Sequence, residues 1–520
     1  MGKKLLPAAL VIITIIYICH PLAQSGNPPT PSPQNNPIAI ENKKTGTTDW
    51  QLTNPATNHE IEGYASLTSV NRGSEIELFV NSKESSYTID IFRMGWYGGA
   101  GGRQIVSAIT RTSVKQPSAM MNEDTRLIEC NWQDPYILSI PARQDEWTSG
   151  VYLAKLTTTK NHKQSYIIFV VRDDSRPSNI LFQTSVNTYQ AYNNWGGASL
   201  YGLNKGTQAY KVSFNRPYGI GRNPGDADGI GSGEFLTGKA GWEYNMLRWL
   251  EKSGYDVAYS TDVDTHLNPI DEFSGQPVLS LHKAFLVVGH DEYWSWQMRQ
   301  NVEKARDHGV SLGFFSANTC YWQIRYEPSR VTGKINRTIV AYKERASIDP
   351  FALDNKPEND RLVTTTWRND PVNRPEDALI GVMYETYKVN SDIIINNTAP
   401  KWVLAGTQLS NTKSHKPRKQ KTLVPGIRLE GLLGYEVDRM FGNAPANTIR
   451  IAHSPYKSGG RRRYSDMTVY TTDKGATVFA TGSMQWNWGL DNYNAPKYRP
   501  ALMNQDAQTI TRNILDRMLG

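Results

Sequence analysis

The first third of the chain is built from short runs in which apolar and polar residues alternate. Gly, Asn, Ser and Pro separate these runs, which lie at 61–64, 76–80, 87–92, 150–156 and 166–171. A period of two is typical of strands with one buried face, and this spacing of strands and turns is typical of antiparallel sandwiches. The pattern predicts an immunoglobulin-like β-sandwich over residues 41–174, with no helix required.

Beyond a polar boundary at 173–178, apolar strands alternate with amphipathic helices. Helices are predicted over 242–253 and 295–308, each ended by a glycine, and over 505–518. Nearly continuous apolar runs fall between them, at 180–182, 257–259, 284–288 and 310–315. Such strands are buried on both faces, so we expect an α/β domain over 178–520 with a mostly parallel sheet. The predicted fold class is therefore all-β followed by α/β.

The first 23 residues have the features of an export signal. Lys3 and Lys4 precede an apolar stretch of roughly 15 residues, which is short for a membrane span and typical of a secretory signal peptide. Cleavage after Ala23 is expected, with an uncleaved anchor as the alternative, and a Pro-rich linker over 24–40 follows. We expect a periplasmic or extracellular protein that meets a membrane only through this signal or anchor.

Composition and charge exclude several classes of protein. The 520 residues are 39% hydrophobic, which is too apolar for a disordered chain. The formal net charge is +8, but nine positive charges lie in two late polar insertions, at 413–421 and 457–463. A nucleic-acid surface would need aromatic residues interleaved with these lysines and arginines, so no nucleic-acid partner is expected. The sequence carries no signal for the oligomeric state.

Polar, aromatic and titratable residues collect where four predicted strands end. In an open α/β sheet the carboxyl ends of parallel strands meet at one edge, where ligands bind. Turn and helix-cap residues explain some of this enrichment, but not its aromatic clusters. We therefore predict one substrate cleft lined by Tyr192, Asn193, Trp195, Asp262, His266, Asn318 and Tyr321.

The sharpest feature is Gly-His-Asp-Glu-Tyr-Trp at 289–294, between a predicted strand and a predicted helix. A helix N-terminus stabilises nearby anions, and His, carboxylates and a phenol are acid–base groups and ligands for hard metals. No Ser or Cys lies in the turn, so covalent acyl chemistry from this loop is not expected. We predict His290, Asp291 and Glu292 as catalytic residues. The alternative for His290 is a structural histidine bonded to the backbone.

Removal of the signal leaves two cysteines, Cys130 and Cys320. In an oxidising compartment they are a possible disulfide that would join distant parts of the chain. The alternative, two buried free thiols, is equally compatible with the sequence. A nucleophilic role for Cys320 is disfavoured by its aromatic neighbours Tyr321 and Trp322.

Four segments carry a resemblance to a known family. They are Glu-Tyr-Trp-Ser at 292–295, Asn-Thr-Cys-Tyr-Trp at 318–322, Trp367-Arg368 with Arg374-Pro375-Glu376, and Ala191-Tyr192-Asn193. Together they resemble the carboxyl-terminal region of the large (beta) subunit of N,N-dimethylformamidase, over roughly 178–515. The resemblance implies a glutamine-amidotransferase-like α/β fold. It also implies hydrolysis of a formamide by one iron, held by two tyrosines and a glutamate, that activates water.

The resemblance also implies particular metal ligands in this sequence. Tyr293 matches one phenolate ligand, and the second tyrosine should lie near the preceding strand, where Tyr259 or Tyr255 is available. The sequence departs from the family where an acidic residue is expected before Trp367-Arg368, because 364–366 are all threonine. Iron is therefore the expected cofactor, but with an incomplete ligand set.

Two functions from different classes follow. The first is an exported metal-dependent hydrolase of amide or related C–N bonds, acting on a small amide-like or envelope-derived substrate. The second is a non-catalytic cell-envelope or secreted protein, in which the sandwich and an aromatic cleft bind a glycan or a peptide.

Overall fold

The structure is a computed structural model that describes residues 35–202, 207–219, 224–236, 241–396, 399–408, 426–493 and 503–520. All of these residues belong to one compact unit, 31–520. The predicted signal at 1–23, most of the linker at 24–40 and the basic insertion at 413–421 lie outside the described residues. Export and a membrane anchor therefore stay predictions.

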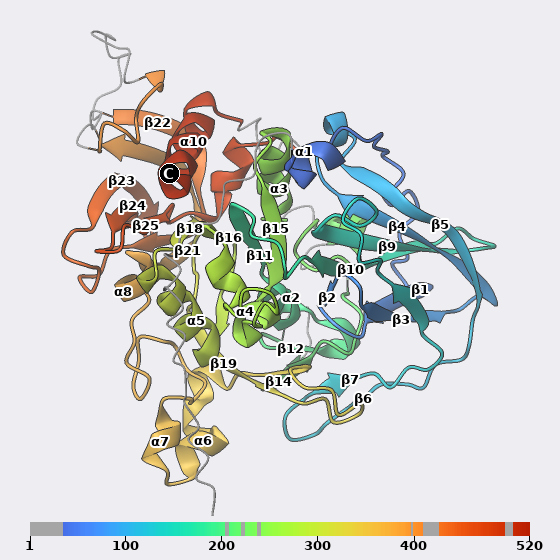
Figure 1. The fold of residues 1–520 in the computed structure, drawn as a ribbon. Helices are drawn as coiled ribbons and strands as arrows, with labels where there is room; N and C mark the ends of the chain where they lie inside the picture. The colour runs from blue at the N-terminus through green and yellow to red at the C-terminus, as the bar shows by residue number, and fades with distance from the viewer. Residues whose placement is uncertain are drawn as a thin grey trace, which may run out of the picture. The chain divides into compact units, whose positions relative to one another are not determined.

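The first part of the described chain is two β-sheets with a shared core (Figure 1). One sheet has the order β2 (Ser69–Asn71), β10 (Gln164–Arg172), β9 (Gly150–Thr158), β4 (Ser86–Met94) and β5 (Gly102–Thr112). The other has the order β1 (Ile61–Ala65), β3 (Glu75–Ser82) and β8 (Tyr136–Ser139). Alternate residues of both sheets meet in the core, among them Ile76 and Leu78 from β3 and Ile89 and Ile91 from β4. The five strands predicted from alternation all exist, because period-two patterning reports directly on a half-buried strand.

The second part is organised around one nine-stranded sheet. Its first five strands are parallel: β15 (Val257–Thr261), β11 (Ile180–Thr184), β16 (Ala284–Gly289), β18 (Ser311–Ser316) and β25 (Thr477–Ala480). The other four are antiparallel: β24 (Arg461–Thr471), β23 (Ile449–Ser458), β21 (Met383–Asn396) and β22 (Gly426–Arg439). The prediction of a mostly parallel sheet is therefore correct only for the first five strands of this sheet.

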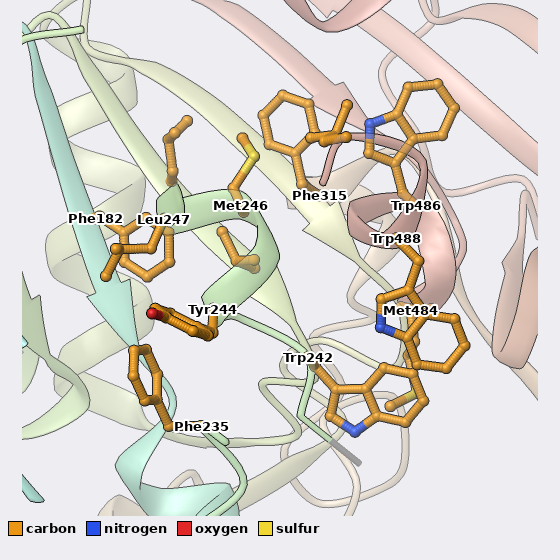
Figure 2. Close-up of a cluster of buried hydrophobic side chains, with 14 of the residues drawn as sticks. Phe182, Phe235, Trp242, Tyr244, Met246, Leu247, Phe315, Met484, Trp486 and Trp488 are labelled. Atoms are coloured by element: carbon orange, nitrogen blue, oxygen red, sulfur yellow. The ribbon is translucent and has the colours of Figure 1, made fainter. Parts of the chain in front are cut away.

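Helices cover both faces of the parallel strands. On one face Leu312 and Phe314 of β18 pack with Met298 and Val302 of α5 (Trp296–Asp307). On the other face, residues such as Phe182 pack with α3 (Tyr244–Lys252) and α10 (Gln505–Leu519). Figure 2 shows this second core, where Trp242, Met484, Trp486 and Trp488 gather beside α3. The three helices predicted from apolar spacing are present, with bounds that differ by at most two residues from the predictions.

The remaining elements are short. A four-stranded sheet has the order β14 (Lys211–Ser213), β20 (Thr338–Val340), β19 (Trp322–Glu327) and β17 (Tyr293–Ser295). Two two-stranded ribbons are β6 (Met120–Met121) with β7 (Ile128–Glu129), and β12 (Ala198–Ser199) with β13 (Thr207–Gln208). Short helices are α2 (Val186–Tyr192), α4 (Asp262–Leu267), α6 (Pro350–Leu353), α7 (Pro357–Asp360) and α8 (Asp377–Ile380). The chain is thus mostly β, in several sheets with few helices. An immunoglobulin-like fold for the first part and an amidotransferase-like fold for the second part stay predictions.

The end of the predicted linker belongs to a helix. Residues Pro37–Glu41 form α1, and the Asn36 side chain caps it by accepting hydrogen bonds from the backbone N–H groups of Ile38 and Ala39. Proline at the first helical turn favours this start, and Ile38 is fully buried in the core that also holds Tyr244. Residues 37–40 of the predicted linker therefore belong to this helix, and the linker over the preceding residues stays a prediction.

Strands of the first part and helices of the second part share that core. Phe92, Leu153 and Tyr166 lie in one buried cluster with Tyr244 and Leu247. The predicted domain boundaries, 41–174 and 178–520, stay predictions. Among the described helices, none has the length and apolar character needed to span a membrane.

Candidate functional site

A carboxylate and three phenols meet at the carboxyl-terminal edge of the parallel strands. Glu292, in the loop after β16, accepts hydrogen bonds from the hydroxyl of Tyr192 at 2.8 Å and from that of Tyr201 at 2.7 and 2.8 Å. The hydroxyl of Tyr293 in turn donates to that of Tyr201 at 2.5 Å. Tyr192 follows β11, so residues from adjacent strand ends do converge on one point. We refer to Glu292, its three tyrosines, His290, Glu234 and Glu436 as the Glu292 cluster.

His290 lies among three carboxylates of this cluster. Its Nε2 is 3.5 Å from both Glu292 Oε2 and Glu436 Oε2, and its Nδ1 is 3.7 Å from Glu234 Oε2. Burial alone would lower the pKa of His290, but the negative charges of Glu436, Glu234 and Glu292 outweigh it and raise the pKa to about 9. The imidazole is therefore protonated at neutral pH. Its Nε2 and Glu234 Oε2 are buried with no hydrogen-bond partner among the described residues.

Asn318 connects the loop after β18 to the antiparallel half of the sheet. Its side-chain amide donates to Glu436 Oε2 at 2.6 Å, and its backbone N–H donates to Asp438 Oδ1 at 2.8 Å. Burial raises the pKa of Asp438 to about 7. Strand β22 thus brings two carboxylates to the edge where the parallel strands end.

Unusual backbone conformations surround the cluster. Gly289, Asn318, Cys320 and Lys343 all have positive φ, at 73°, 54°, 57° and 58°. At Gly289 a Cβ would lie 2.3 Å from Trp242 Cβ, so no other residue fits without a shift of the backbone. Strained backbone of this kind clusters at functional sites, because the surrounding structure must hold it in place.

Lys343 is a buried cation beside the phenols. Its Nζ lies 3.4 Å from the centre of the Tyr201 ring and 5.0 Å from that of Trp322, and it donates to the carbonyl oxygen of Leu200 at 3.2 Å. A lysine over an aromatic face is attracted by the ring quadrupole. Lys343 therefore places positive charge next to the otherwise acidic cluster.

Asp262 and Asp291 form a second, fully buried group, which we call the acid pair. Gln183 donates to Asp291 Oδ2 at 2.6 Å, and the backbone N–H of Asn187 donates to Asp262 Oδ2 at 2.7 Å. Burial and the neighbouring carboxylate raise the pKa of Asp262 well above its usual range, and burial raises that of Asp291 to about 6. Two buried carboxylates in contact share a proton, so one of them is neutral at pH 7.

Tyr321 lies at the border of the Glu292 cluster. Its ring centroid is 5.1 Å from that of Tyr384, and the Arg368 guanidinium lies 5.2 Å from its ring. Arg368 is itself bound by the Glu376 carboxylate at 2.9 Å. Burial, then the charges of Glu436 and Glu292, raise the pKa of Tyr384, which places this tyrosine within the electrostatic reach of the cluster.

Four predicted site residues lie elsewhere. Asn193 shapes a turn, donating to Gln190 and Pro217 and accepting from Trp195 and Gly219. Trp195 donates through Nε1 to Glu62 at 2.7 Å, beside the first part of the chain. His266 bonds Ser295 at 2.8 Å and packs on Tyr326. Tyr259, predicted as a metal ligand, donates to Glu251 at 2.9 Å, which is also the partner of Arg93. Alternation along β15 and a helix break after α2 direct these side chains to other neighbours.

The possible disulfide between Cys130 and Cys320 is not formed. Both are buried free thiols, and they lie in different hydrophobic clusters, Cys130 with Trp132 and Cys320 with Met298. Burial raises the pKa of the Cys320 thiol well above its usual range, so it is a poor nucleophile.

The chain matches one protein family over most of its length. The family is described as N,N-dimethylformamidase beta subunit-like, C-terminal, and the match covers residues 88–499. The chain belongs to this family. The N,N-dimethylformamidase beta subunit of an Alcaligenes species is 21% identical over 63% of this chain, and that of Paracoccus aminophilus is 19% identical over 65%. The chain spans 44% of the length of each of these relatives.

For this dimethylformamidase-like chain, the match begins earlier than the sequence resemblance at 178. It starts within β4 and includes β9 and β10. The family region therefore contains strands of both parts of the described chain.

Sequence reasoning did not identify Tyr201, Glu234, Glu436 or Lys343 as site residues. Tyr201 lies beyond a glycine-rich turn and Lys343 beyond β20, so neither directly follows a recognised strand. Glu436 was missed because β22 was not predicted. One signal was available: an isolated Glu between apolar residues, in Leu-Leu-Gly-Tyr-Glu-Val-Asp, marks a buried carboxylate in a strand.

The Glu292 cluster also bears on the metal implied by the family. Among the described residues, no group of three His, Cys, Asp or Glu side chains is arranged to hold a metal ion. Phenol oxygens supply most of the donors in this cluster. The Tyr192 and Tyr201 hydroxyl oxygens lie 2.8 and 2.7 Å from the Glu292 carboxylate and 3.1 Å from each other. This donor set fits a hard cation such as ferric iron.

Proposed function

We propose that this chain hydrolyses an amide or related C–N bond at the Glu292 cluster. The observation that carries the proposal is Glu292 itself, a buried carboxylate held by two phenols 3.5 Å from the His290 imidazole. Membership of a family whose relatives are named N,N-dimethylformamidase beta subunit supports the same reaction class. A small amide-like or envelope-derived compound is the proposed substrate.

The residues divide the work of hydrolysis between a base and an acid. Glu292 accepts a proton from the attacking water as the water oxygen bonds to the carbonyl carbon. The C–N bond then breaks, and the nitrogen leaves with a proton from His290, whose pKa of about 9 keeps it protonated beforehand. The proton held by Glu292 returns to His290, 3.5 Å away, and restores the site.

The tyrosines position Glu292. Two charge-assisted hydrogen bonds from Tyr192 and Tyr201 fix the carboxylate, and the Tyr192 and Tyr201 rings stack at 4.4 Å. Burial and the charge of Glu292 raise the pKa of Tyr201 well above its usual range, so in this arrangement it stays a hydrogen-bond donor.

Iron is the proposed cofactor. Glu292 and Tyr201, with Tyr192 or Tyr293, are the residues that would hold it. When bound, the metal would act as a Lewis acid and lower the pKa of water. In that state the phenols would give up their protons, and Lys343, over the Tyr201 ring, would offset the added negative charge.

Amide hydrolysis is tested by supplying the full chain with N,N-dimethylformamide, formamide and acetamide and measuring released amine or ammonia. Glu292→Gln keeps the shape and removes the base, so kcat/KM should fall by about 100-fold or more. Glu430→Gln, on exposed β22 surface, is the matched control. Hydrolysis of none of the three amides, or full activity of the Glu292 variant, contradicts the proposal.

The iron component is tested separately by elemental analysis of the purified chain. Tyr201→Phe should lose bound iron, and Tyr210→Phe, which removes a phenol stacked on Tyr342, should retain it. Absence of iron from the natural chain, or equal iron loading of both variants, contradicts the proposal that iron is the cofactor. Neither result decides whether the chain hydrolyses amides.

We also propose the finer fold and the location. The two sheets with a shared core support an immunoglobulin-like sandwich, and the five parallel strands covered on both faces support an amidotransferase-like arrangement. The charged and apolar residues at 1–23 support export to the periplasm or the medium.

A further inference from the structure

A cavity of about 710 Å³ lies between the first and second parts of the chain. Its walls come from β1, β10 and the segment 116–121 on one side, and from residues 194–197, 218–219 and 230–231 on the other. This volume is in the range of small-molecule binding sites. None of its lining residues belongs to the Glu292 cluster or the acid pair, so we treat this junction cavity as a separate site.

One buried carboxylate organises the polar side of the junction cavity. Glu62 Oε2 accepts from Trp195 Nε1 at 2.7 Å and lies 2.6 Å from His59 Nδ1. The Glu62 side chain is 10% exposed, whereas that of His59 is 61% exposed. His59 therefore stands at the solvent side of the pair and Glu62 inside.

Aromatic rings form another part of the wall. Trp132 and Trp195 meet edge to face, with ring centroids 6.1 Å apart, and Tyr166 and Tyr218 also line the cavity. Such rings supply flat apolar area with few rotatable bonds. The lining also includes uncharged polar side chains, namely Thr57, Asn81, Gln116, Ser118, Ser165 and Asn194.

Two of these polar groups lack partners. The Ser165 hydroxyl and Asn194 Oδ1 are buried and have no hydrogen-bond partner among the described residues. Ser165 as a whole is only 1% exposed. Buried polar atoms are nearly always paired, so an unpaired hydroxyl and amide oxygen beside a cavity indicate that something else supplies the bonds.

The charges of the lining residues limit which class of ligand the cavity can bind. No Lys or Arg is among the lining residues, and His59 is already paired with the one carboxylate, so an anionic ligand would meet no unpaired positive charge among them. Aromatic faces, amides, hydroxyls and one carboxylate together suit a molecule with apolar C–H faces and a rim of hydroxyl groups. We propose that the junction cavity binds a short neutral oligosaccharide.

Binding is tested by calorimetric titration of the full chain with cellotriose, maltotriose and N,N′,N″-triacetylchitotriose. At least one neutral trisaccharide should bind saturably. Trigalacturonate, an anionic control, should bind at least about tenfold more weakly than that trisaccharide. Triglycine tests whether the cavity binds a peptide instead of a sugar. Binding of none of the neutral sugars, or preference for triglycine or trigalacturonate, overturns the proposal.

Two variants locate the binding. Ser118→Trp should fill the cavity and abolish binding, whereas Ser85→Trp, on an exposed hairpin of the first part, should not change it. Glu62→Gln preserves shape and should weaken binding by about tenfold. If circular dichroism shows that Ser118→Trp does not fold, the affinity of the Glu62→Gln variant still tests whether the sugar binds in the junction cavity. Unchanged affinity in Glu62→Gln, or in a folded Ser118→Trp, overturns the assignment of the site.

Discussion

Gly289 sets the position of the four residues that directly follow it, three of which belong to the Glu292 cluster. Its φ of 73° turns the chain out of β16, and a Cβ there would collide with Trp242. The next four residues supply His290, Asp291, Glu292 and Tyr293. A small displacement at this turn would therefore move the acid, the base and a phenol together.

Gly289→Ala is expected to destabilise the fold by about 2–4 kcal/mol and to reduce amide hydrolysis. The added methyl group has no room, and the left-handed backbone adds strain. Gly254→Ala is the matched control, because its φ is 77° but nothing lies within 4 Å of its added Cβ. The control should lose only about 1 kcal/mol, and equal losses in urea unfolding would contradict the steric explanation.

His282 makes stability depend on pH. It is buried, with Nδ1 2.9 Å from the Ser178 hydroxyl and 3.1 Å from the Ser178 carbonyl oxygen. Burial lowers its pKa from 6.5 to about 4. Between these values the unfolded chain binds a proton that the folded chain does not, so stability should fall as pH drops from 6.5 to 4.

The expected loss from this one histidine is roughly 3 kcal/mol. Urea unfolding at a series of pH values should therefore show a shallower fall in His282→Gln than in the natural chain. His162→Gln, at an exposed turn, should retain the natural slope. Parallel slopes for all three proteins would show that other groups cause the acid loss.

At the scale of single residues, the site residues of one loop could be predicted from the sequence, but the residues that contact this loop could not. His290, Glu292 and Tyr293 directly follow a strong apolar strand, so their place at a strand end was predictable. Tyr201 meets Glu292 across 91 residues of chain, and no local pattern encodes that contact. Tyr259 was chosen for its strand, but its side chain faces the pair of Arg93 and Glu251.

Strand β4 and helix α3 are joined by a fully buried ion pair. Arg93 and Glu251 are 2.7 Å apart with both side chains 0% exposed, and Tyr97 and Tyr259 donate hydrogen bonds around them. The Tyr97 hydroxyl reaches Glu41 of α1, whose pKa is lowered to about 2 because Arg93 and Arg103 outweigh its burial. Three elements distant in sequence therefore depend on one network.

Glu251→Ala should destabilise the chain by about 3–5 kcal/mol, because it leaves the Arg93 charge buried without its partner. The double variant Arg93→Met with Glu251→Leu should recover most of that loss in the same denaturation experiment. Arg143→Ala breaks a pair that is 71% and 66% exposed, and should leave the urea midpoint almost unchanged. A double variant as unstable as Glu251→Ala would contradict a purely electrostatic penalty.

Elements with a single strong period were predictable, and long mixed ones were not. The stripe in 295–308 and the glycine after it gave α5 almost to the residue. Strands β21 and β22 contain 14 residues each, with polar residues and irregular pairing that interrupt any alternation. Their pairing depends on distant partners, so the antiparallel half of the sheet, with Glu436, was not predicted.

At the scale of the whole molecule, the two predicted domains share buried surface. Tyr244 of α3 donates to the carbonyl oxygen of Gly101 at 2.6 Å and packs edge to face on Trp50 at 5.8 Å. The family match from residue 88 onward includes strands of both parts. Alternation and periodicity describe single elements, so neither pattern could indicate this shared core.

A chain of residues 35–520 should therefore unfold in one calorimetric transition. A chain of residues 178–520 would expose Tyr244 and Leu247, which are at most 2% exposed in the structure, and should aggregate or fail to unfold cooperatively. Two separate transitions in the longer chain, or a stable, monomeric shorter chain, would show that the second part folds on its own.

The buried free thiols of Cys130 and Cys320 can report local opening of the structure at two places. Cys130 and Cys320 are each 0% exposed, one beside Trp132 at the edge of the first part and one against α5. A buried thiol reacts with an alkylating reagent only when its surroundings open. Mass spectrometry of the labelled peptides would therefore time opening at both places in one sample, with no residue replaced.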